Sequence, residues 1–125
     1  MGAILLCRTR EVPSPEHIAE ALREAGYEAF VEVESGHPTT SISTEIRYTS
    51  GKMPIVIRFY NDLYDDPDEK DYDYFDWMEE LVPDAEARKT IRRFIFVDAM
   101  ENVEQRAFQS VVKYICVKTD ALIFA

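Results

Sequence analysis

Three short, wholly apolar runs constrain this chain more than any other feature of its sequence. They are AILLC at residues 3–7, FIFV at residues 94–97 and ALIFA at residues 121–125. Each is too short for a buried helix but has the length of a strand that is covered on both faces. We therefore expect these three runs to form the central strands of a β-sheet.

Three further segments alternate apolar and polar residues, as strands with one solvated face do. In residues 28–34 the alternation places Ala29, Val31 and Val33 on one face and the glutamates with Phe30 on the other. Residues 42–49 and 55–60 repeat this pattern on either side of a Ser-Gly turn, which predicts an antiparallel hairpin. Residues 35–40 are predicted to be a loop. The outward face would mix opposite charges with apolar side chains, which is ordinary for a solvated sheet face, although such a face could also bind a partner.

The first predicted helix has a marked beginning and end. Ser14 is expected as its N-cap, Pro15 as its first residue and Gly26 as its left-handed C-terminal cap. Its apolar stripe is predicted to consist of Ile18 and Leu22 with Ala25 and Ala21.

Two later helices carry capping-box patterns. Asp66 with Glu69 predicts a helix over residues 66–82, whose apolar stripe contains Tyr74, Met78 and Leu81 with Phe75 and Trp77 beside them. A short helical turn through Arg88 should follow. Asn102 with Gln105 predicts a last helix that ends near residue 118.

The predicted order is strand, helix, three strands, helix, strand, helix, strand. This order indicates an α+β fold in which helices pack on a single-layer mixed sheet of about six strands. The three apolar strands would be central and the three alternating strands peripheral. At 125 residues the chain is expected to form one globular domain, residues 1–125, without metal or disulfide support.

Charge is concentrated in one part of the chain. Residues 62–86 contain 12 of the 24 acidic residues and one base, Lys70, which gives this acidic stretch a charge of −11. The other residues together carry +1, so the net charge of −10 belongs to the acidic stretch. Such a charge disfavours direct binding of nucleic acid or an anionic membrane and favours a basic partner.

The sequence gives no support for catalysis or for a cofactor. No nucleophile elbow or phosphate-binding loop is present, and His17 and His37 are far apart in sequence. Cys7 and Cys116 lie among apolar residues, as reduced, buried thiols do. The aspartates of the acidic stretch could suit Ca²⁺, but an EF-hand loop starting at Asp66 lacks its glycine and its final glutamate. We predict no metal, no cofactor and no catalytic residue.

One basic cluster follows the acidic stretch, at Arg88, Lys89, Arg92 and Arg93. We interpret it as partial neutralisation of the acidic stretch and of a helix C-terminus. The chain has no apolar run that could cross a bilayer and no secretory signal, and we expect a cytoplasmic protein.

These observations favour a small acidic protein-binding module, and specifically an inhibitor of immunity or antitoxin type that docks an acidic surface on a basic protein. The alternatives are a small enzyme with a site at the ends of the central strands and a Ca-stabilised structural domain. The expected partner-binding residues begin the acidic stretch, where acids surround two tyrosines that can anchor an interface: Asp62, Tyr64, Asp65, Asp66, Asp68, Glu69, Asp71, Tyr72 and Asp73.

Overall fold

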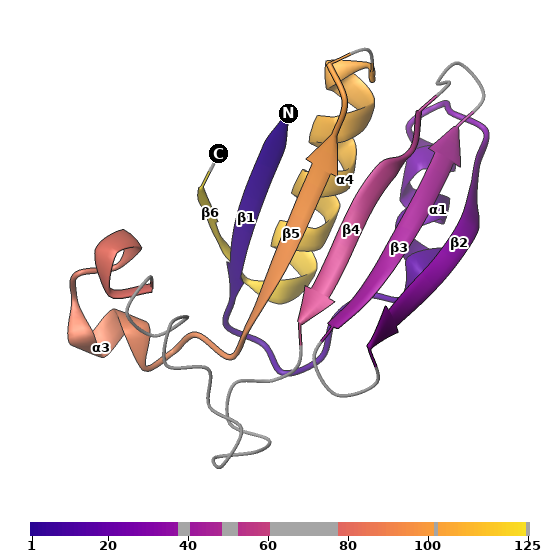
Figure 1. Ribbon diagram of the computed structural model, residues 1–125. Helices are drawn as coiled ribbons and strands as arrows, with labels where there is room; N and C mark the ends of the chain where they lie inside the picture. Colours follow the sequence, from indigo (N-terminus) through magenta and orange to yellow (C-terminus); the bar gives the residue numbers. More distant parts are fainter. Residues whose placement is uncertain (38–40, 49–52, 61–77, 102, 125) are drawn as a thin grey trace.

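A computed structural model describes residues 1–37, 41–48, 53–60, 78–101 and 103–124 of the chain. The helices and strands among them follow the predicted order (Figure 1). They are β1 (Gly2–Cys7), α1 (Pro15–Glu24), β2 (Ala29–His37), β3 (Ser41–Tyr48), β4 (Ile55–Tyr60), α3 (Ala85–Arg88), β5 (Arg93–Ala99), α4 (Gln105–Thr119) and β6 (Leu122–Phe124).

The six strands form one sheet in the order β2-β3-β4-β5-β1-β6. The predicted α+β class with a single sheet of six strands is therefore confirmed. All five neighbouring pairs are antiparallel, so the prediction of a mixed sheet is wrong in this respect. Strand periodicity shows which faces are buried but not in which direction the neighbouring strand runs.

The strand order also corrects the predicted centre of the sheet. β1 and β5 are interior as expected, but β6 lies at an edge beside β1, and β3 and β4 are interior. An apolar sequence occurs at this edge because both sides of β6 meet apolar neighbours. Leu122 and Phe124 pack against one face of the sheet, whereas Ile123 lines a groove with α4 on the other face.

Alternation along the central strands divides the core into two clusters. In β1, Leu5 and Cys7 point towards α1 and α4, which lie behind the sheet in Figure 1, and Leu6 points to the front. The rear cluster unites the two helices with five strands. The front cluster is smaller, and its buried members are Leu6, Met78, Val82, Ile91 and Phe94. Fully burying each large apolar side chain stabilises the fold by about 1.5–3 kcal/mol.

The caps of α1 agree with the prediction. The Ser14 hydroxyl accepts a hydrogen bond from the His17 backbone N–H at 3.2 Å. At the other end Gly26 has φ +99°, and the Tyr27 N–H donates to the Leu22 carbonyl at 3.0 Å. Ala19, rather than the predicted Ala25, is buried beside Ile18 and Leu22.

The start of α4 differs from the prediction. The helix begins at Gln105, and Glu104 is its N-cap without a side-chain hydrogen bond, whereas the sequence pattern places the cap at Asn102, outside the described residues. Tertiary contacts account for the later start: Val103 is buried in the core, and the Glu104 N–H donates to the hydroxyl of Tyr48 at 2.8 Å. The helix buries Ala107, Phe108, Val111, Val112, Ile115 and Thr119, and it ends at Thr119, close to the predicted end near residue 118.

β2 is longer and less regular than predicted. It continues to His37 through part of the predicted loop, and its register against β3 shifts between Val31 and Val33. This bulge makes Glu32 an extra residue and moves Val33 to the same face as Glu45, so Val33 is 42% exposed instead of facing the core. A bulge reverses the alternation beyond it, which no count of alternating residues reveals.

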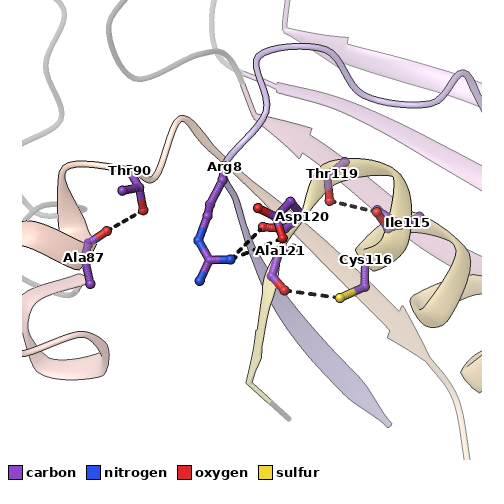
Figure 2. Close-up of polar contacts among 8 residues, drawn as sticks. All are labelled: Arg8, Ala87, Thr90, Ile115, Cys116, Thr119, Asp120 and Ala121. Carbon is purple, nitrogen blue, oxygen red and sulfur yellow. Dashed lines mark hydrogen bonds and ion pairs between the residues drawn. The ribbon is translucent and has the colours of Figure 1, made fainter.

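The C-terminal end of α4 is fixed by contacts that Figure 2 shows. Asp120 adopts a left-handed conformation with φ 47°, and its carboxylate pairs with the Arg8 guanidinium at 3.3 Å. The buried Thr119 hydroxyl donates to the Ile115 carbonyl at 2.7 Å, and the Cys116 thiol donates to the Ala121 carbonyl at 3.2 Å. These bonds direct the chain from the helix into β6. No helix in the described part of the chain is long and apolar enough to span a membrane.

Candidate partner-binding surface

The nine predicted partner-binding residues, between Asp62 and Asp73, lie outside the described residues. The predicted helix over residues 66–82 is described only at its end, where residues 78–81 are helical. The structure does define how residues 78–86 of the acidic stretch pack on the sheet. It also defines the end of β4, the strand that precedes the stretch.

Both attachment points belong to the front cluster. On the N-terminal side, the Tyr60 ring at the end of β4 packs on Phe96 of β5, with ring centroids 5.1 Å apart. On the C-terminal side, Met78 and Val82 are buried against Leu6 and Phe94. The described residues on either side of positions 61–77 therefore pack in the same cluster.

Residues 78–86 separate apolar from acidic side chains. Met78 is only 2% exposed and Leu81 packs against the front cluster, whereas Glu79 and Glu80 are exposed. Asp84 and Glu86 continue the exposed acidic row into α3. In its described part, the acidic stretch thus anchors itself through apolar residues and presents carboxylates to solvent, as its sequence pattern predicts.

Local hydrogen bonds hold this acidic row in place. The Asp84 carboxylate accepts a hydrogen bond from the Glu86 N–H at 3.1 Å and so caps α3. The Arg88 guanidinium donates to the carbonyls of Val82 and Pro83 at 2.8 and 2.7 Å. Arg88 therefore satisfies carbonyls at the end of the preceding helical turn, as expected for the basic cluster.

The other bases of this cluster differ in their surroundings. Lys89 pairs with Glu86 at 3.1 Å across one helical turn, and both side chains are exposed. Arg92 and Arg93 are half-buried at the start of the central strand β5. Lys89 thus neutralises one carboxylate locally, and Glu79, Glu80, Asp84 and Glu86 are all exposed.

The front face of β2, β3 and β4 carries the predicted mixture of charged and apolar groups. Arg47 pairs with Glu32 of the bulge, and Phe30 is 51% exposed opposite Arg47. Arg58 is exposed on β4, next to the half-buried Val56. Because opposite charges on this face pair across strands, its composition is that of a solvated sheet face.

A polar contact that the sequence did not indicate joins the connection after α1, the end of β3 and the N-cap of α4. The Tyr27 and Tyr48 rings meet edge to face with centroids 5.5 Å apart, and Tyr27 hydrogen-bonds to Glu104. This bond to a carboxylate raises the pKa of Tyr27 above its ordinary value. The three residues are far apart in sequence, and no local pattern brings them together.

The Cys7 thiol is unsuited to nucleophilic chemistry. Burial raises the pKa of Cys7 to about 11, so this thiol holds little of the reactive thiolate near neutral pH. Cys116 is a half-buried free thiol. The described residues also contain no group of three or more His, Cys, Asp or Glu that could hold a metal ion.

No family model, curated protein or solved structure matches this chain. The described part of the acidic stretch, residues 78–86, combines an apolar anchor at Met78 and Val82 with exposed carboxylates.

Proposed function

We propose that this chain is a small cytoplasmic protein-binding module that captures a basic protein on its acidic stretch, as inhibitors of immunity or antitoxin type do. One observation carries the proposal: the stretch holds a charge of −11 while the rest of the chain is nearly neutral. Charge gathered on one surface steers an oppositely charged partner and speeds its association.

The attachment of the stretch supports this proposal. Its described end buries Met78 and Val82 and leaves Glu79, Glu80 and Asp84 exposed. A surface of this kind can bind a partner without losing the apolar contacts that hold it to the sheet. Tyr64 and Tyr72, among the acids, are the proposed aromatic anchors of the interface.

Affinity capture from the native host with two matched charge-reversal variants tests the proposal. The first variant replaces Asp65, Asp68, Asp71 and Asp73 by Lys and keeps Asp66, the expected N-cap. The second replaces four exposed acids elsewhere by Lys, namely Glu11, Glu20, Glu24 and Glu101. Both variants have a net charge of −2 instead of −10.

We expect the first variant to lose the captured basic protein and the second to keep it. Capture by the wild-type chain should weaken as salt rises. At 0.1–0.15 M salt the attraction between exposed charges is largely screened beyond a distance of about 8–10 Å. Equal capture by both variants, with unchanged salt dependence, would show that the acidic stretch is not the binding surface.

A further inference from the structure

An apolar groove lies on the face of the sheet that carries α4, where this helix passes the edge of the sheet, whereas Met78 and Val82 pack in the front cluster. It encloses about 490 Å³ between α4, the beginning of β1 and β6. Its floor contains the nearly buried Phe108 and Val112, and its rim contains Val117 and Ile123, which are 72% and 48% exposed. We call this feature the α4 groove.

The groove lies beside the part of β1 that has no partner among the described residues of β6. β1 pairs with β5 from Gly2 to Cys7 but with β6 only from Ile4 to Leu6. Among the described residues, no β6 residue lies opposite Gly2 and Ala3, and both line the groove. The side of α4 that faces this end of the sheet is therefore left accessible.

The charge of the groove is opposite to that of the whole protein. α4 contains three bases and no acid, although the chain as a whole carries −10. Lys113 is the only charged side chain among the described residues that line the groove, and it is exposed one helical turn from Val117. Gln105 and Gln109 continue the same helical row on α4. On the β1 side the groove is lined by Met1, whose N-terminal ammonium donates to the Ala99 carbonyl at 2.7 Å and is a second cation.

This combination of an apolar floor, a volume in the range of small-molecule sites and a cationic rim without an acid among its described lining residues defines a ligand class. We propose that the α4 groove binds an alkyl carboxylate, a monoanion with one unbranched apolar chain. The alkyl chain lies on Phe108 and Val112, and the carboxylate faces the Lys113 ammonium. This site is independent of the acidic stretch and of the function proposed above.

Titration of the full-length protein with dodecanoate, below its micelle concentration, tests the proposal. Methyl NMR signals of Val112, Val117 and Ile123 report binding in the groove, and calorimetry gives the affinity. Dodecanol and dodecyltrimethylammonium serve as neutral and cationic probes with the same chain. We expect dodecanoate to bind most tightly and the cationic probe least tightly.

Two pairs of variants distinguish dodecanoate binding in the groove from nonspecific binding that depends only on net charge or on exposed apolar surface. Lys113→Glu should weaken dodecanoate binding about fivefold, whereas Lys118→Glu, with the same charge change beside Tyr114 on α4, should not. Val117→Asp should abolish saturable binding, whereas Met100→Asp, at another exposed apolar residue, should leave it unchanged. Both apolar positions are more than half exposed, so all variants should remain folded.

Three results would overturn the proposal. One is an absence of saturable dodecanoate binding. Another is equal weakening by Lys113→Glu and Lys118→Glu, or equal affinity for the cationic probe, because the carboxylate would then not be recognised at Lys113. The third is a dimer in sedimentation that Val117→Asp disperses, since a second copy of the chain would then occupy the groove.

Discussion

Tyr27 illustrates how single residues acquire properties that their sequence neighbours do not supply. Its hydroxyl is bonded to Glu104 at the start of α4, and its ring meets that of the buried Tyr48. The bond stabilises the protonated phenol beside a carboxylate, so the pKa of Tyr27 is raised above 10.0. A group whose pKa is raised on folding stabilises the fold below its unfolded pKa. That contribution is lost as the pH rises through the higher folded value.

Replacing Glu104 by Gln should therefore lower the pKa of Tyr27, because the carboxylate that raises it is removed. Titration of Tyr27 by NMR measures this change directly. The part of the free energy of unfolding that is lost as the pH rises through the titration of Tyr27 should also be smaller in the variant, because the folded and unfolded pKa values of Tyr27 then lie closer together. Glu101→Gln, an exposed acid outside this contact, is the control and should leave the titration unchanged. An unaltered Tyr27 titration in Glu104→Gln would contradict the assigned hydrogen bond.

Cys7 should react with thiol reagents only when the protein unfolds, because its side chain is fully buried and its pKa is raised to about 11. In a Cys116→Ser variant, a chromogenic disulfide reagent at pH 8 should label Cys7 slowly, at a rate that rises when urea is added. The same reagent should label Cys116 faster in a Cys7→Ser variant, since Cys116 is only half-buried. Rapid labelling of Cys7 in the folded protein, without urea, would contradict this expectation and show that β1 separates readily from its neighbours.

Among the elements, the helical turn at residues 78–81 links the acidic stretch to the core. Its sequence pattern of buried and exposed residues was predictable from helical spacing, and the structure agrees for Met78, Glu79, Glu80 and Leu81. The surface that this turn packs on was not predictable, because Leu6 and Phe94 belong to strands distant in sequence. Local periodicity fixes which side of an element is apolar, whereas the partner of that side depends on the strand order.

Met78→Ala should lower the free energy of unfolding by about 2–4 kcal/mol, since it leaves a cavity between the turn and the sheet. Urea denaturation followed by circular dichroism measures the loss. Glu79→Ala, at the adjacent exposed residue, should change stability by less than about 0.5 kcal/mol. Equal stability of the two variants would mean that residues 78–82 contribute little to the front cluster.

For the molecule as a whole, the concentrated charge should oppose folding through repulsion among the carboxylates of the acidic stretch. We expect the melting temperature to rise by roughly 2–5 °C between low salt and about 0.15 M salt, because screening reduces this repulsion. The variant with four reversals at Asp65, Asp68, Asp71 and Asp73 should show a smaller rise. Differential scanning calorimetry provides the measurement, and a melting temperature independent of salt would contradict the expectation.

The candidate surface was located in the sequence by counting charges, and its nine central residues remain a prediction because they lie outside the described residues. The structure adds the attachment of the stretch, through Tyr60 on one side and Met78 with Val82 on the other. Neither the common anchor in the front cluster nor the α4 groove was predictable, since both are formed by elements that only long-range strand pairing brings together.

Most of the secondary structure follows from local chemistry. The caps of α1, the short apolar strands and the alternating hairpin follow from hydrogen bonds and side-chain periods that act over a few residues. Three features required the folded chain: the edge position of β6, the reversal of Val33 by the bulge and the late start of α4. The physical reason is that strand neighbours, bulges and buried helix ends are chosen by contacts between residues far apart in sequence. The chain alone specifies which surfaces are apolar, and tertiary packing selects which of them meet.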